Sequence, residues 1–206
     1  PDTDWFYMGE EPVSVLNKMS PRFDEIFTDE MRQEVQNDGR TIQDVVTVAS
    51  MIEKETDGSD QAKIASVIYN RLDNPTSETA GYLNIDATIL YATGGTEVDL
   101  NADTPYNTRT HKGLTPTAIA SPGVDALKAA VYPDSTRYYF YALGDDGKHH
   151  FFATYREPQN FIASPERSQN GCEHNRTALP CRGPGAPAHV PGLRGRRRLP
   201  RGARSR

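Results

Sequence analysis

The stretch IQDVVTVASMIEKET, residues 42–56, decides how the first half of the chain folds. At about 100° per residue, its apolar side chains fall on one arc, which predicts a helix with one buried face. Thr41 and Asp44 stand at its start with the spacing of a helix-capping arrangement. The segment therefore reads as a capped helix that packs through its apolar arc.

A carboxyl side chain interrupts the apolar arc of this helix. Glu53 falls inside the arc, whereas Glu55 falls at its edge, roughly 160° away from Glu53. Because an ionised carboxylate is costly on a buried face, we expect desolvation to raise the pKa of Glu53. A carboxylic acid that is protonated near neutral pH can act as a general acid. The alternative is a half-solvated helix-end glutamate, or one paired with Arg71.

Seven short motifs occur in order along residues 1–163. They are PDT at 1–3, VASMIEKET at 48–56, VIYNRL at 67–72, LNIDATILY at 83–91, YNT at 106–108, a long motif at 113–130 and YYFY at 138–141. Together they resemble the catalytic domain of the YceG-like endolytic murein transglycosylases. The resemblance implies a lyase that cleaves MurNAc–GlcNAc bonds within peptidoglycan strands, leaves 1,6-anhydro-MurNAc ends, and ends the elongation of nascent strands.

The composition changes abruptly after Ser164. Residues 165–206 contain ten Arg, six Pro and six Gly but no Lys, and their formal charge is +8, against −13 for the preceding residues. A segment with so few apolar side chains is expected to be disordered, so we divide the chain into a domain at 1–163 and a basic tail at 164–206. The tail could bind nucleic acid or another anionic polymer, serve as a linker, or be GC-rich DNA translated out of frame.

The resemblance also implies where such a domain works and what it contacts. The chain has no apolar run near the ~20 residues of a membrane helix, and it begins within a motif, so we read the domain as truncated at its N-terminus. The family implies a single-pass anchor upstream in the bacterial cell membrane and an extracytoplasmic catalytic domain. The implied partners are peptidoglycan strands and cell-wall synthesis enzymes, without nucleic acid.

The remaining pattern predicts an α+β fold with a helical first half. Polar and Gly-rich residues at 94–121 predict a long irregular substrate loop. Two aromatic-rich runs flank a Gly-Asp-Asp-Gly turn at 144–147 and predict a C-terminal β-hairpin. Besides the helix at 42–56, the expected helices lie at 12–27, 28–36, 59–72, 86–92 and 121–131.

The two glutamates cannot flank one glycosidic bond. Residues two apart on a helix point about 200° from each other, which is about 160° in the other direction. This leaves one well-placed acid, Glu53. One acid suits a lyase that protonates the glycosidic oxygen and then accepts the proton of the attacking C6 hydroxyl. Candidate substrate-binding residues lie on the second helix of the pair, on the next short helix and in the irregular loop: Asn70, Arg71, Asp86, Thr88, Tyr106, Asn107 and Thr108.

Each of these candidates also has a structural interpretation. Arg71 could pair with Asp73 or Glu55, Asp86 could cap its helix, and residues 106–108 could form a turn. The five His residues show no zinc-type spacing and no glycine pair matches a phosphate loop, so we predict neither a metal nor a cofactor.

Two other functions remain open at this stage. One is a non-catalytic peptidoglycan-binding module in which Glu53 is merely buried. The other is a lysozyme-type muramidase that uses Asp86 or Glu55 as a second carboxylate.

Overall fold

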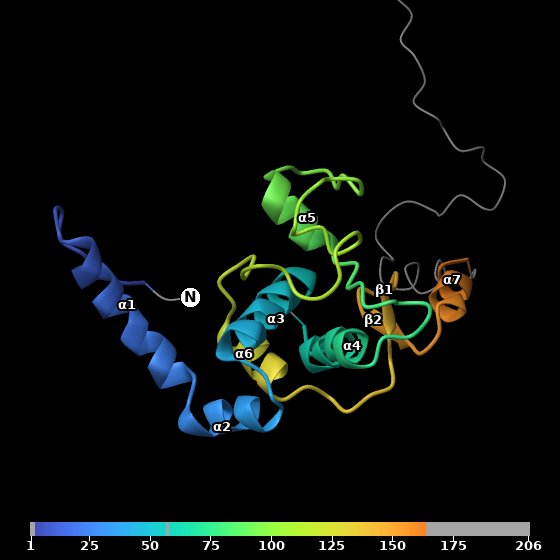
Figure 1. Ribbon diagram of the computed structural model, residues 1–206, viewed down its shortest axis with the longest axis horizontal. Coiled ribbons are helices and arrows are strands. Elements are labelled where there is room, and N and C mark those ends of the chain that lie inside the picture. The colour runs from blue at the N-terminus through green and yellow to red at the C-terminus, as the bar shows by residue number, and fades with distance from the viewer. Residues whose placement is uncertain (1–2, 57, 164–206) are drawn as a thin grey trace, which may run out of the picture.

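The computed structural model describes residues 3–56 and 58–163 (Figure 1). Its elements are α1 (Pro12–Ile26), α2 (Asp29–Asn37), α3 (Ile42–Glu55), α4 (Gln61–Asp73), α5 (Asp86–Thr93), α6 (Val124–Val131), β1 (Phe140–Leu143), β2 (His149–Phe152) and α7 (Arg156–Ala163). The α+β class, the helical first half and the hairpin are confirmed. The predicted tail at 164–206 lies outside the described residues, so its disorder remains a prediction.

Helix α3 is the centre of the domain. It begins with the predicted capping box, in which the Thr41 hydroxyl accepts from the Asp44 backbone and the Asp44 carboxylate accepts from Thr41. It packs against α2, α4, α5 and α6, and all of residues 47–52 are buried. The sequence predicted one buried face, but in the structure neighbouring elements cover this helix on nearly every side.

The irregular segment between α5 and α6 closes over α3. The Ser50 hydroxyl donates to the carbonyl of Thr47 and accepts from the backbone of Ile119, with donor–acceptor distances of 2.7 Å and 2.9 Å. Ile119 itself is buried in the core. This contact fixes the end of the irregular segment and allows a polar residue to sit in the interior without an unpaired group.

Two helices start later than the sequence predicts. Helix α4 begins at Gln61 instead of Ser59, and α6 begins at Val124 instead of Ser121. The backbone N–H of Gly123, the N-cap residue of α6, donates to the Glu53 carboxylate at 3.0 Å. A residue far away in the sequence thus contacts the start of this helix.

The hairpin and the last helix form the other end of the domain. Strands β1 and β2 pair antiparallel, with Phe140 opposite Phe152 and Leu143 opposite His149. Helix α7 packs on both strands and was not anticipated from the sequence. Its Pro158 stands in the first turn, where proline is tolerated, and Glu157 accepts hydrogen bonds from the backbone of Ala153 and Thr154.

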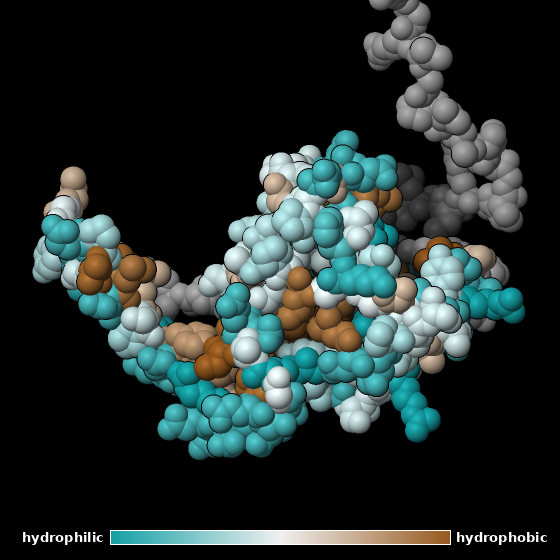
Figure 2. Space-filling view, viewed as in Figure 1, coloured by the Kyte–Doolittle hydropathy of each residue, from teal (hydrophilic) through white to brown (hydrophobic). Residues whose placement is uncertain are grey.

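Helix α1 extends away from the body of the domain (Figure 1). It continues through Pro21, buries none of its residues, and exposes apolar side chains including Val13, Leu16 and Met19 (Figure 2). None of the helices in the described ranges is long and apolar enough to cross a membrane.

Candidate active site

Glu53 is exposed, so the prediction that it lies on a buried face is wrong. Its carboxylate accepts the hydrogen bond from Gly123 at the first turn of α6. A carboxylate at this position interacts favourably with the positive end of the helix dipole. The contact explains why an acid stands on the apolar arc: α6 presents a polar helix end to it.

Glu55 occupies the desolvated position that the sequence assigned to Glu53. It is half-buried, and its Oε2 accepts a hydrogen bond of 2.8 Å from the Tyr141 hydroxyl of β1. Burial raises the pKa of Glu55, although the hydrogen bond from Tyr141 opposes the rise. The two glutamates point to different neighbours, as their helical spacing predicts, but the acid with the raised pKa is Glu55.

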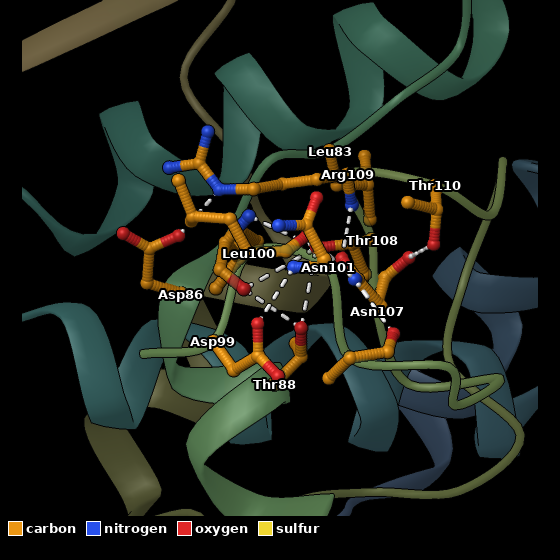
Figure 3. Close-up of polar contacts among 12 residues, drawn as sticks. Leu83, Asp86, Thr88, Asp99, Leu100, Asn101, Asn107, Thr108, Arg109 and Thr110 are labelled. Atoms are coloured by element: carbon orange, nitrogen blue, oxygen red, sulfur yellow. Dashed lines mark hydrogen bonds and ion pairs between the residues drawn. The ribbon is translucent and has the colours of Figure 1, made fainter. Parts of the chain in front are cut away.

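Charged groups from three other elements act on Glu55. The negative charge of Asp86, at the start of α5, raises the pKa of Glu55 further, whereas His149 on β2 and Arg71 on α4 lower it. Asp86 is itself paired with Arg109, whose Nε lies 2.7 Å from Oδ1 of Asp86 (Figure 3). Asp86 is the first residue of α5 and not its cap, which is Ile85. A second carboxylate therefore stands near Glu55.

Arg71 is a buried arginine that ties three segments together. Its guanidinium donates to the backbone carbonyls of Tyr139 and Leu83, and it lies over the ring of Phe140. Neither of its predicted ion pairs is present among the described residues, since Arg40 binds Asp73 instead. Arg71 therefore holds the hairpin and the start of the α5 region beside Glu55.

Asn70 has a similar position beside the segment that leads into the hairpin. Its side-chain amide donates to the carbonyls of Thr136 and Tyr138 at 3.1 Å and 2.9 Å. These bonds fix the backbone just before β1, the strand that carries Tyr141.

Besides Arg71, three predicted binding residues are buried, and Figure 3 shows them: Thr88, Asn107 and Thr108. The Thr108 hydroxyl accepts from the backbone of Ile85 and lies 3.2 Å from the Thr88 hydroxyl, which fixes the start of α5. The amide of Asn107, which is fully buried, donates to the carbonyls of Leu100 and Ala102. These side chains shape the irregular segment and satisfy their own polar atoms within it.

Tyr106 lies at the surface of the same segment. Its hydroxyl is 2.8 Å from that of Thr117, and its ring packs against Tyr91 of α5 with centroids 5.3 Å apart. Of the residues predicted in the loop, Tyr106 is the one that combines partial exposure with an aromatic face.

The sequence did not point to Tyr141, Asp60, His149 or Arg109 as members of the site. His149 Nδ1 and Asp60 Oδ2 are 2.7 Å apart, and the His149 ring contacts the edge of Tyr141. Burial acts to raise the pKa of Asp60. The hydrogen bonds from His149 and Thr56 outweigh this effect and hold that pKa below its usual value. These residues come together only through tertiary contacts, and no local motif marks them.

The site consists of protein groups suited to proton transfer. Within the described ranges, no cluster of His, Cys, Asp and Glu has the arrangement of a metal site. Burial and the neighbouring Glu55 raise the pKa of Tyr141 well above its usual value, so its hydroxyl stays protonated as a donor. The geometry can hold a carboxylic acid in its neutral form and deliver its proton.

Known proteins are similar to this chain in sequence and in fold. The chain is 34% identical over 154 residues to an endolytic murein transglycosylase of Bacillus subtilis, which covers 72% of this chain and 40% of that protein. It is 33% identical over 120 residues to an endolytic murein transglycosylase of Streptococcus pneumoniae, covering 52% of this chain and 21% of the relative. This chain thus spans less than half the length of either relative.

A solved structure and a family model agree with these matches. The crystal structure of a yceG-like protein from Listeria monocytogenes superposes with a TM-score of 0.65 at 30% identity, covering 76% of this chain and 52% of that one. The family model described as the YceG-like family matches residues 1–164. The chain belongs to the YceG-like family.

Proposed function

We propose that this domain cleaves peptidoglycan glycan strands internally as a lytic transglycosylase, with Glu55 as the general acid. The observation that carries the proposal is the half-buried position of Glu55 at the end of the central helix. Burial raises the pKa of its carboxyl group. Two relatives, 34% and 33% identical to this chain, are named endolytic murein transglycosylases. Glu53 was the first choice from the sequence, but its exposure and its contact with Gly123 favour a structural role.

The reaction needs one group that gives and then takes a proton. Neutral Glu55 protonates the oxygen of the scissile bond between N-acetylmuramic acid and N-acetylglucosamine, and the bond from C1 to this oxygen breaks. The resulting carboxylate then accepts the proton of the C6 hydroxyl while the C6 oxygen forms a bond to C1. The product is a 1,6-anhydro ring, water is not consumed, and Glu55 returns to its neutral form.

The other predicted residues divide into two groups in this proposal. Asp86 and Tyr106, which are partly exposed, contact the strand. The buried or bonded side chains position the segments that carry the site: Asn70, Arg71, Thr88, Asn107 and Thr108.

The relatives also support a cellular setting. Proteins named for murein cleavage act on the cell wall, so we place this domain outside the cytoplasm, held by a single-pass anchor in the longer protein. There it would work beside cell-wall synthesis enzymes and terminate nascent strands.

A second candidate is a muramidase that hydrolyses the same bond. The observation in its favour is the Asp86 carboxylate near Glu55, since two carboxyl groups can activate water or form a covalent intermediate. The pairing of Asp86 with Arg109 favours the lyase, because it ties up the second carboxylate.

Mass spectrometry of murein digested with the full chain separates the possibilities. The proposal predicts new 1,6-anhydro ends within the strands. Reducing ends would establish the hydrolase instead, and the absence of cleavage together with retained binding would establish a non-catalytic binding module.

A further inference from the structure

A cavity of about 330 Å³ lies between α3 and α5, next to the proposed acid. Lys54 and Ile119 line one side, and Ala87, Leu90 and Tyr91 line the other. Lys54 directly precedes Glu55, and Ala87 directly follows Asp86. The cavity is therefore lined by the chain neighbours of both carboxylate residues, on the same two helices that carry them.

Lys54 is the cation of this cavity. It is exposed, and within residues 3–56 and 58–163 its ammonium has no carboxylate partner. The sequence up to Ser164 has a net charge of −13, so a polyanionic strand would be repelled by the body as a whole. The ammonium of Lys54, which lines the cavity, would then decide where an anionic group of the strand can rest.

The apolar part of the cavity suits a sugar with an acetamido group. Tyr91 is half exposed, and the ring of Tyr106 packs against it with the two ring planes tilted by 54°. The side chains of Leu90, Ile119 and Ala87 offer a pocket for a methyl group. Binding sites of this kind combine apolar walls with a few convergent polar groups.

We propose that this cavity is a carboxylate-selective glycan subsite, in which Lys54 pairs with an acidic substituent of the sugar that rests on Tyr91. This inference rests on the proposed function and adds the substrate chemistry that the domain selects. Two sources can supply the carboxylate in peptidoglycan: the lactyl group of a muramic acid stripped of its peptide, and the peptide attached to that lactyl group.

Lys128 provides a matched control. Like Lys54, it stands in the last turn of a helix and is exposed, but it lines a different cavity of about 520 Å³ between α6 and the start of α4. Any general effect of removing a helix-end lysine should therefore appear in both variants.

The test measures dissociation constants for the 206-residue chain carrying Glu55→Gln, which prevents turnover during the measurement. The added variants are Lys54→Met, Lys54→Arg and Lys128→Met, and the ligands are peptide-free murein strands, peptide-bearing strands and chitin oligosaccharides. A charge-assisted contact predicts that Lys54→Met weakens binding to a carboxylate-bearing strand by roughly tenfold or more. Lys54→Arg should retain most of the affinity, and Lys128→Met should change nothing.

The ligands separate the sources of the carboxylate and the ways in which the proposal fails. A loss on peptide-free strands identifies the lactyl carboxylate, and a loss confined to peptide-bearing strands identifies the peptide. An equal loss on chitin oligosaccharides, which lack carboxylates, would overturn the proposal, as would no loss on any ligand. Anhydro-end formation by the chain with Glu55 intact tests the proposed function separately, so failure of one leaves the other standing.

Discussion

The two faces of the last turn of α3 carry the same functional group in different surroundings. On one face Glu53 is exposed and meets the N–H of Gly123 at the start of α6. On the other face Glu55 lies under the hairpin, bonded to Tyr141 and close to the charge of Asp86. The comparison shows that two glutamates of one helical turn have different surroundings, and that burial raises the pKa of Glu55.

The largest expected difference between the two faces is in turnover. Glu55→Gln is nearly isosteric and removes the transferable proton, so kcat for anhydro-end formation should fall by about 10²–10⁴-fold or more. Glu53→Gln keeps an acceptor for Gly123, so its kcat should stay within a few-fold of wild type. The reverse ranking, measured on the same murein preparation, would place the acid on the α6 face.

The next effect concerns the segment that builds the Glu55 face. Asn107→Ala removes a fully buried amide that donates to the carbonyls of Leu100 and Ala102, so two partly buried hydrogen bonds are lost. We expect a loss of about 1–3 kcal/mol in the free energy of unfolding, measured by urea denaturation. Asn101→Ala is the matched control, because Asn101 is exposed in the same segment. Equal stabilities for the two variants would show that Asn107 does not support the loop.

A smaller effect is expected in the pH dependence of activity. Tyr141 donates to Glu55 and so favours its ionised form, with Arg71 and His149 acting in the same direction and Asp86 in the opposite one. Removing the hydroxyl in Tyr141→Phe should raise the pKa of Glu55 and move the alkaline limb of kcat/KM to higher pH. Tyr139→Phe, in the residue before β1, should leave the limb in place. A shift to lower pH in Tyr141→Phe would contradict the proposed hydrogen bond.

The smallest expected effects are on the stabilities of the Glu53→Gln and Glu55→Gln variants, and they should differ in sign. Glu53→Gln removes a charge from the start of α6, which should cost about 0.3–1 kcal/mol and lower Tm by about 1–3 °C. Burial raises the pKa of Glu55 in the folded protein. The free energy of unfolding therefore falls as the pH rises from the pKa of Glu55 in the unfolded chain to its pKa in the folded protein. Glu55→Gln should therefore raise Tm at neutral pH but not in acid. Calorimetry at both pH values checks the two signs.

Local sequence patterns predicted most of the helices and the hairpin, because capping residues and apolar periodicity act over a few residues. They missed α7, and they placed the start of α6 too early; the residue before that helix, Gly123, donates to Glu53, 70 residues away. Glu55, the acid that we propose, could not be singled out from the sequence for the same reason. The residue that covers Glu55, Tyr141, lies 86 residues further along the chain, and no helical period encodes that contact.

The candidate site shows the same division. The motifs pointed to the segments that surround the proposed acid, and the charge of Asp86 acts on Glu55. Side chains such as Asn107 and Thr108, which the sequence suggested for sugar binding, are buried and bonded to the backbone instead. An amide or hydroxyl in an irregular loop has the same appearance in sequence whether it binds a ligand or holds the loop together.

The most direct test of the account is a carbon-13 NMR titration of the Glu55 carboxyl, assigned by comparison with the Glu55→Gln variant. Burial predicts that this carboxyl titrates clearly above the ~4.3 of a free glutamate. It also predicts that the midpoint moves upward in Tyr141→Phe. A Glu55 that titrates at or below the free value would contradict the central claim, because the α3 end would then hold no desolvated acid on the hairpin face.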